Sequence, residues 1–182
     1  LKFYHFIDNL NIKNIDKLNN NIGLIYRNYH KKPLENEIYK FKIFCKKKNR
    51  KFIISNYIDL VNKYNLDGLY IPSFNKKKLY LGNKNHNTFI LIGSAHNVKE
   101  IRIKEKQGVK QIILSPIFKS KNSNRSLGLY RYNLLATQTK LPTIALGGIS
   151  KDKIKIVKST KAIGFASINY FKNKNLWTLI KI

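Results

Sequence analysis

The sequence predicts a compact, closed (β/α)8 barrel in a single domain. Three observations predict this fold: short apolar runs recur along the chain, amphipathic segments separate them, and eight such runs fit into 182 residues. Short continuous apolar strands that alternate with helices are typical of parallel βαβ units, and eight such units close into a barrel. An open doubly wound sheet is the alternative if one or two of the weaker strands fail to form. Because no linker-like stretch or internal repeat divides the chain, residues 1–182 are expected to form one barrel domain.

Each predicted strand is a run of three to five mainly apolar residues, rich in β-branched and aromatic side chains that suit a buried strand. Polar or glycine-containing sequence bounds every run, so the strands are expected to be short. In chain order they are Phe3–Ile7, Ile22–Tyr26, Phe52–Ile54, Gly68–Ile71, Phe89–Ile92, Gln111–Leu114, Thr143–Leu146 and Ala162–Ala166.

The segments between the strands mix apolar and polar residues in the amphipathic pattern of a surface helix. In chain order they are Pro33–Lys48, Tyr57–Tyr64, Val98–Gln107, Tyr130–Thr137 and Lys151–Ser159, with Trp177–Ile182 as a closing helix. A chain of 182 residues is shorter than the usual barrel of this kind. The expected structure is therefore a small TIM barrel in which some helices are short or missing.

The composition is strongly basic, with 36 Lys and Arg against 9 Asp and Glu and a formal net charge of +27. Such a charge normally suggests a polyanionic partner. However, Lys, Asn, Ile, Tyr and Phe are abundant from end to end, which is typical of AT-rich codons, and the basic residues are scattered over every predicted helix and loop. We therefore do not expect a nucleic-acid partner.

Cysteine content and hydropathy point to the cytoplasm. The one cysteine, Cys45, cannot form an intrachain disulfide, and no apolar stretch approaches the length of a membrane helix or a signal-peptide core. We therefore expect a cytoplasmic protein without a membrane partner.

The stretch LPTIALGGIS places the doublet Gly147-Gly148 directly after the seventh strand. A tight turn would explain two glycines, since glycine adopts backbone angles closed to other residues. In a barrel, however, the loops after strands seven and eight commonly hold phosphate. The residues after the eighth strand include Ile168 and Asn169 and also leave the backbone accessible. We therefore predict a phosphate site formed by Gly147, Gly148, Ile168 and Asn169.

Three further polar residues lie near predicted strand ends and are candidate catalytic residues. Arg27 follows the second strand, and its guanidinium suits a pair of phosphate or pyrophosphate oxygens. Ser94 and His96 follow the fifth strand. A histidine can act as a general acid or base, but a lone histidine such as His96 more often has a structural, hydrogen-bonded role.

Several motifs together resemble the family of thiamine-phosphate synthases and TenI-type thiazole tautomerases. The stretches SPIFKS, LPTIALGGIS and GFASINYF occur in that family's order and at its distances from HNVKEIRIKEKQGV. Weaker similarity runs upstream through DGLYIPSFN, FIISNYIDLV, IGLIYRNYH and FYHFID. The resemblance covers nearly the whole chain, is most specific in the second half, and itself implies a (β/α) barrel.

The resemblance implies a role in thiamine biosynthesis. Synthases of this family join a pyrimidine pyrophosphate to a thiazole phosphate, so both phosphorylated molecules are the implied partners. By motif position, Arg27 would contact the pyrophosphate and Ser94 matches a family serine. The residues that would hold the thiazole phosphate are Gly147, Gly148, Ile168 and Asn169.

The chain departs from the synthase pattern at the implied magnesium site. The family's synthases usually carry aspartates at the positions of Asn56 and Asn75. Magnesium prefers charged oxygen ligands, so the resemblance here implies a weak Mg²⁺ site at best and no certain cofactor. A second pyrophosphate-binding run of the family is replaced by Ser120-Lys121-Asn122-Ser123, in which Ser120 and Lys121 remain candidate substrate contacts.

These departures leave three functions open. The first is a divergent synthase in which lysines near the site, such as Lys119 and Lys121, neutralise pyrophosphate without a metal. The second is a thiazole tautomerase, which the Pro72-Ser73 pair resembles more closely, although that branch can carry a catalytic histidine where this chain has Pro116. The third is a barrel that binds phosphorylated ligands without catalysis. We therefore lean toward an enzyme, with the synthase as the first hypothesis.

Overall fold

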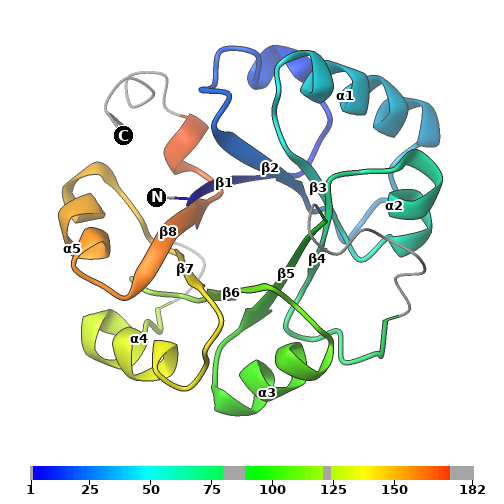
Figure 1. Cartoon of the computed structure of the whole chain (residues 1–182). Helices are drawn as coiled ribbons and strands as arrows, with labels where there is room; N and C mark the ends of the chain where they lie inside the picture. The colour runs from blue at the N-terminus through cyan, green and yellow to red at the C-terminus, as the bar shows by residue number, and fades with distance from the viewer. Residues whose placement is uncertain (1, 80–88, 121–123, 173–182) are drawn as a thin grey trace.

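The structure is a computed structural model that describes residues 2–79, 89–120 and 124–172. Eight parallel strands pair in chain order, and β8 pairs with β1 to close the barrel (Figure 1). The predicted closed barrel is thus confirmed, and the open-sheet alternative is wrong. The strands are β1 Lys2–Ile7, β2 Ile22–Tyr26, β3 Phe52–Ser55, β4 Gly68–Ile71, β5 Ile90–Ala95, β6 Gln111–Leu114, β7 Thr143–Leu146 and β8 Ala162–Ser167. The assignment of all 182 residues to one domain stays a prediction.

Side chains alternate along the strands between the barrel interior and the layer beneath the helices. The interior is filled by a buried cluster to which all eight strands contribute, with residues such as Ile25, Ile53 and Ile92. The intervening residues, such as Leu24 and Phe52, pack outward in a second buried cluster with the helices. Because each strand is covered on both faces, it reads in the sequence as a continuous apolar run rather than an alternating one.

The helices surround the barrel on its outside (Figure 1). Within the described part of the chain they are α1 Glu35–Lys47, α2 Ile58–Tyr64, α3 Val98–Lys106, α4 Gly128–Ala136 and α5 Ile154–Lys158, with 3-10 turns η1 Ile12–Asn14, η2 Lys151–Lys153 and η3 Tyr170–Lys172. The segment predicted as one helix over Lys151–Ser159 is thus a 3-10 turn followed by a short α-helix. The predicted closing helix Trp177–Ile182 lies outside the described residues.

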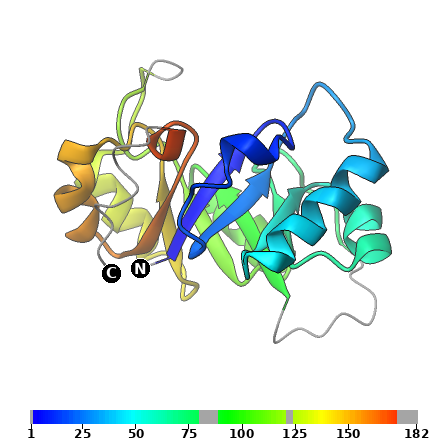
Figure 2. The same ribbon diagram turned by 90° about the horizontal axis from the view of Figure 1, so that it is seen from above.

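The barrel is seen from the side in Figure 2, where β1 rises from the N-terminus. Because all strands are parallel, their carboxyl ends meet at one rim. Alternate residues of a strand face the same side, so the residues two positions beyond the inward-facing isoleucines of β2, β3, β5 and β6 also face inward. At this rim, facing the mouth of the barrel, they are Arg27, Ser55, Ser94 and Ser115. Ser94 belongs to β5, which continues to Ala95 because its pairing with β6 continues to that residue. The predicted end of this strand at Ile92 was therefore too early.

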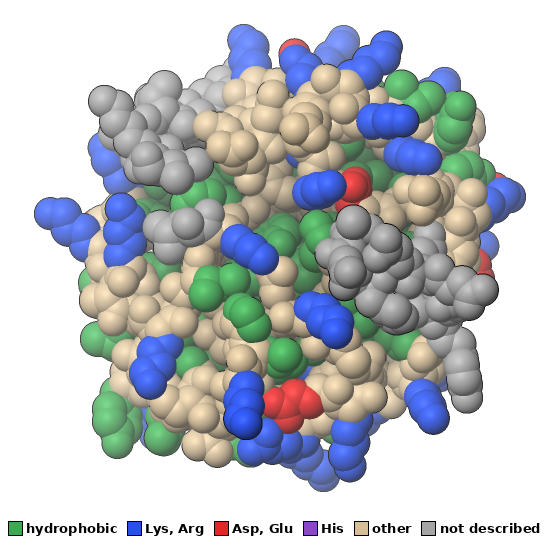
Figure 3. All heavy atoms as spheres, in the orientation of Figure 1, with side chains coloured by type: hydrophobic (Ala, Val, Ile, Leu, Met, Phe, Trp, Pro, Cys, Tyr) green, Lys and Arg blue, Asp and Glu red, His purple; other side chains and the backbone are tan. Residues whose placement is uncertain are grey.

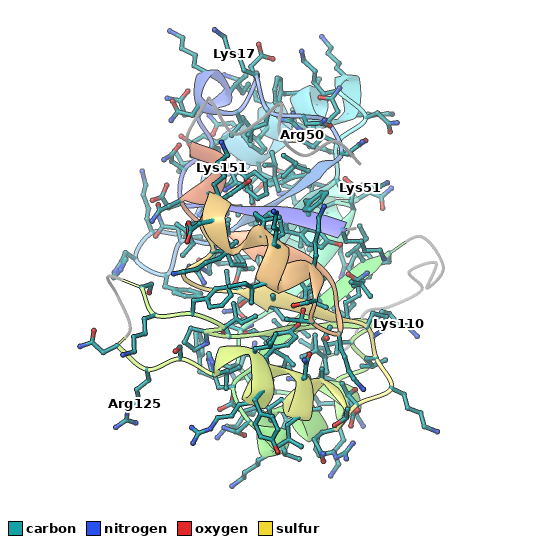
Figure 4. All side chains as sticks on the ribbon, turned by 90° about the vertical axis from the view of Figure 1, so that its left-hand side faces the viewer. Lys17, Arg50, Lys51, Lys110, Arg125 and Lys151 are labelled. Atoms are coloured by element: carbon teal, nitrogen blue, oxygen red, sulfur yellow. The ribbon has the colours of Figure 1, made fainter. Side chains whose placement is uncertain are left out.

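Basic side chains project from many parts of the surface (Figure 3). Of the six labelled in Figure 4, Lys17, Lys110 and Arg125 lie at widely separated places on the barrel. Arg50 differs, because it is buried to 2% exposure and donates hydrogen bonds to the Ile15 and Leu18 carbonyl oxygens. On the sides of the molecule that Figures 3 and 4 show, the basic residues are dispersed rather than gathered into one patch.

Candidate active site

The mouth of the barrel carries two regions of different chemistry. Over β7 and β8 lies a cavity of about 270 Å³, which we call the Gly148 cavity; it is lined by Ser120, Leu146, Gly147, Gly148, Ile149, Ser167, Ile168 and Asn169. Over β2 to β6 the rim is occupied by a guanidinium, hydroxyls, amides and an imidazole, which we call the Arg27 region; its members are Arg27, Ser55, Asn56, Tyr70, Ser73, Asn75, Ser94 and His96.

All four residues of the predicted phosphate site line the Gly148 cavity. The two glycines also have a packing reason, since both have positive φ, 103° at Gly147 and 62° at Gly148. A Cβ on Gly147 would lie 2.7 Å from the Pro116 Cβ, and a Cβ on Gly148 would lie 2.7 Å from the Phe118 carbonyl oxygen. Turn geometry and close packing therefore account for the doublet, and the cavity is a separate observation in favour of a ligand.

The loop after β6 also reaches the Gly148 cavity. Ser120 lines it, although the sequence placed this serine with the pyrophosphate contacts. Ser167 lines it as well, but its hydroxyl already accepts a hydrogen bond from the Tyr170 backbone N–H at 2.9 Å. Lys121 lies outside the described residues. Among the described residues, the lining of the cavity thus offers backbone, hydroxyl and amide groups rather than lysine or arginine side chains.

Arg27 is held between aromatic rings. Its guanidinium carbon lies 4.5 Å from the ring centre of Phe6 and 5.8 Å from that of Tyr29, distances at which a cation is attracted to a ring face. Tyr29 in turn meets Phe74 edge to face, with ring centres 5.3 Å apart. These contacts orient a planar group suited to bind two oxygens of a phosphate at once.

Hydroxyl groups line the mouth beside Arg27. The Tyr70 hydroxyl donates a hydrogen bond to Ser94 Oγ at 2.9 Å, and both residues are buried. Burial raises the pKa of Tyr70 to about 12, so this phenol keeps its proton at neutral pH. Ser55 Oγ is also buried and makes no hydrogen bond of acceptable geometry. Burial raises the pKa of the neighbouring Tyr29 phenol, and Ser55 partly offsets that rise. An unpaired buried hydroxyl costs about 1–3 kcal/mol, so it marks a place where a ligand can be bound.

The two amides at the implied magnesium positions contact each other. Asn75 Nδ2 donates a hydrogen bond to Asn56 Oδ1 at 2.9 Å, and Asn75 Oδ1 accepts one from the Lys77 backbone N–H at 3.0 Å. Both amide oxygens are therefore already used within the protein. Asn56 has a φ of 64°, a left-handed conformation that asparagine tolerates better than most residues.

A magnesium ion does not fit this donor set. Mg²⁺ is held mainly by carboxylate and phosphate oxygens in octahedral geometry, and here two neutral amides satisfy each other. Within residues 2–79, 89–120 and 124–172, no three His, Cys, Asp or Glu side chains cluster in a way that could hold a metal. We therefore assign no step of the chemistry to a metal.

His96 connects two loops through its ring. Nδ1 lies 2.7 Å from the Ser115 carbonyl oxygen, and Nε2 lies 3.1 Å from Ser73 Oγ. Since a carbonyl can only accept, Nδ1 carries the proton, and in the neutral ring Nε2 accepts a hydrogen bond from the Ser73 hydroxyl. The backbone N–H of His96 donates to Glu100 Oε2 at 2.8 Å, which fixes the loop. His96 is thus hydrogen-bonded on both nitrogens, yet it sits at the rim beside a hydroxyl.

Three residues of the Arg27 region were not predicted from the sequence as site residues: Ser55, Tyr70 and Ser73. Strand parity could have found the first two, because Ser55 lies two residues beyond inward-facing Ile53 and Tyr70 itself belongs to the interior cluster. The contact between Ser73 and His96 joins loops 23 residues apart in sequence, and no local pattern reveals it.

Comparison with known proteins points to one family. The family described as thiamine monophosphate synthase matches residues 21–171. A protein of Aquifex aeolicus, provisionally named as a second thiamine-phosphate synthase, is 30% identical over 143 residues, which are 75% of this chain and 76% of that one. The thiamine-phosphate synthase of Prochlorococcus marinus is 32% identical over 133 residues, 69% of this chain but 37% of that longer protein.

A solved structure shows the same fold. The thiamine phosphate pyrophosphorylase of Pyrococcus furiosus superposes with a TM-score of 0.74 at 20% identity, covering 93% of this chain and 86% of that one. At this identity the superposition shows the fold alone, whereas the family match over residues 21–171 shows the family. The chain therefore belongs to the thiamine monophosphate synthase family.

Proposed function

We propose that this protein is a divergent thiamine-phosphate synthase, a transferase that joins a pyrimidine pyrophosphate to a thiazole phosphate. Family membership supports the proposal. The observation that carries it is the division of one barrel mouth into the Gly148 cavity and the Arg27 region. The reaction needs one place for a monophosphate and another for a pyrophosphate, and the two regions would provide them.

The proposed chemistry relies on position and charge. The carbon that joins the pyrimidine to its pyrophosphate forms a bond to the thiazole, and the bond to pyrophosphate breaks, so that pyrophosphate leaves with the electron pair. Arg27 would stabilise the charge on the leaving group, and Ser94 would orient it. Gly147, Gly148 and Asn169 would hold the thiazole phosphate so that the reacting atoms meet.

Pyrophosphate would be bound without a strong metal site. The hydrogen bond between Asn56 and Asn75 supports this part of the proposal, because it uses the oxygens that would face a cation. Arg27 would then carry most of the counter-charge, with Lys121 as a further predicted contact. Ser120, which lines the Gly148 cavity, would serve the thiazole phosphate instead.

The test is direct synthesis. The purified protein is incubated with pyrimidine pyrophosphate and thiazole phosphate, with Mg²⁺ or with EDTA, and thiamine phosphate and pyrophosphate are measured. We expect equal amounts of both products, with only a weak dependence on Mg²⁺. The variant Arg27→Met should lose turnover, whereas Lys106→Met, at an exposed position of α3, should not. If both ligands bind but no product forms, the synthase hypothesis is wrong and the protein is a barrel that binds phosphorylated ligands without catalysis.

A tautomerase is the second candidate, and the Ser73–His96–Ser115 arrangement favours it. With its proton on Nδ1, His96 presents Nε2 as a base that could remove a proton from a ring carbon and return it elsewhere on the thiazole. Incubation of a thiazole phosphate in D₂O, without the pyrimidine, would test this function. Deuterium incorporation by the natural protein but not by His96→Gln would support it.

The proposed partners are small phosphorylated molecules. On the sides seen in Figures 3 and 4 the basic side chains form no single patch, and the absence of a nucleic-acid partner stays a prediction from the sequence. No helix within residues 2–79, 89–120 and 124–172 is long and apolar enough to cross a membrane. A location in the cytoplasm stays a prediction from the sequence.

A further inference from the structure

Lys104 is a lysine of α3 with no exposed surface, and its surroundings are neutral. Its ammonium donates to the Pro72 carbonyl oxygen at 2.8 Å, the Asn75 carbonyl oxygen at 2.6 Å and Gln107 Oε1 at 2.9 Å. Three acceptors match the three N–H groups of an ammonium. None of them is charged, so the ion is not paired directly; the Glu100 carboxylate favours the charged form from a greater distance.

A buried charge without a direct partner is unfavourable, and an apolar side chain of similar length would fill the same space. Packing alone therefore does not explain a lysine here. The barrel is also shaped to admit it, because a Cβ on Gly93 of β5 would lie 2.8 Å from Lys104 Cδ. The ammonium must have a use at the carbonyl oxygens that it reaches.

Those carbonyl oxygens bracket the loop after β4. Pro72 and Asn75 flank Ser73 and Phe74, and Gln107 adds hydrogen bonds from its Nε2 to the Asn75 and Lys77 carbonyl oxygens at 3.1 and 2.7 Å. The other loops of the Arg27 region lead into α1, α2 or α3, whereas residues 72–79, the described part of the loop after β4, form no helix. Side chains at the C-terminal end of α3 therefore support this loop.

The loop carries side chains that complete the Arg27 region. Ser73 contacts Nε2 of His96, Phe74 contacts Tyr29 beside Arg27, and Asn75 pairs with Asn56. We propose that Lys104 is a positioning residue that holds residues 72–77 in the geometry needed for pyrophosphate binding, while the Gly148 cavity is independent of it. The positioning role rests on the proposed function only in the choice of pyrophosphate as the ligand.

The test replaces the ammonium and keeps the stem. Lys104→Met is compared with Lys106→Met, an exposed lysine two residues along the same helix. Imidazole signals of His96 are followed by NMR in the ligand-free proteins, and the affinities for inorganic pyrophosphate and for thiazole phosphate are measured by calorimetry. We expect Lys104→Met to shift the His96 signals and to weaken pyrophosphate binding at least tenfold, with thiazole phosphate affinity changed less than twofold.

A second variant guards against a folding defect. In Gly93→Ala with Lys104→Ala, the new Cβ occupies space vacated by the lysine stem, so packing is partly restored while the anchor is absent. This double variant should show the same loss of pyrophosphate binding. Equal losses for both ligands, or unchanged His96 signals, would overturn the inference. Shifted His96 signals in a protein whose natural form does not bind pyrophosphate would uphold the positioning role and refute the synthase.

Discussion

Restoring carboxylates at positions 56 and 75 should create a magnesium-dependent protein. In either single variant, Asn56→Asp or Asn75→Asp, the remaining amide can still donate to the new carboxylate, because the pair is in hydrogen-bond contact at 2.9 Å. Each single change should therefore cost less than about 1 kcal/mol of folding free energy. In the double variant two carboxylates face each other with no donor between them.

The size of the effect follows from that contact. Two unit charges about 4 Å apart repel by about 4 kcal/mol at the effective dielectric of about 20 that suits a half-buried site. Partial protonation and side-chain rotation reduce this, so we expect a loss of roughly 2–4 kcal/mol at pH 7 and low salt. For a chain of this length that corresponds to a melting temperature lower by roughly 5–15 °C. Saturation with Mg²⁺ at about 100 times its Kd should return about 2.7 kcal/mol.

The assay is thermal unfolding of the natural protein, both single variants and the double variant, each in EDTA and in MgCl₂. The double variant should lose far more stability than the two single losses together, and Mg²⁺ should rescue that variant alone. Any synthase activity should rise with it. The reasoning fails if the losses are additive, or if the natural protein already gains several degrees or its turnover from Mg²⁺.

Three more predictions follow from named contacts. Arg27→Lys should weaken pyrophosphate binding roughly tenfold by calorimetry, because a point charge replaces a planar fork, and binding by the natural protein should weaken as NaCl rises from about 0.05 to 0.5 M; salt-independent affinity would contradict this. Gly148→Ala should lower the free energy of unfolding in urea by more than about 2 kcal/mol, since its Cβ would meet the Phe118 carbonyl oxygen at 2.7 Å. Gly128→Ala also has positive φ but meets no atom within 4 Å, so it should lower that free energy by only about 1 kcal/mol. Equal losses in the two variants would refute the packing argument. Burial lowers the pKa of Lys104 from 10.5 to about 8, so the unfolded chain binds more protons than the folded one between these pH values. The free energy of unfolding should therefore rise by roughly 2–3 kcal/mol from about pH 8 to about pH 10, relative to Lys104→Met. Parallel pH profiles of the two proteins would show that the lysine is not held charged in a desolvated place.

The amino-acid sequence was sufficient to predict the barrel and the strand ends at which the candidate site lies. Eight apolar runs predicted eight strands, because a parallel strand covered on both faces must be apolar throughout. The order of the strands then placed Arg27, Ser94 and the Gly147-Gly148 doublet at one rim. These features depend on local composition and chain order, which a sequence states directly. Helix ends were less accurate, since short helices depend on packing for their stability.

The tertiary structure decided how the site is assembled. The pairing of Asn56 with Asn75, the contact of Ser73 with His96 and the grip of Lys104 on the loop after β4 join residues 19 to 32 positions apart. Lys104 looked like one of many surface lysines, because a sequence shows a side chain's charge but not what surrounds it. Whether a lysine is solvated or buried against carbonyl oxygens depends on the distances between elements, and those distances exist only once the barrel has closed.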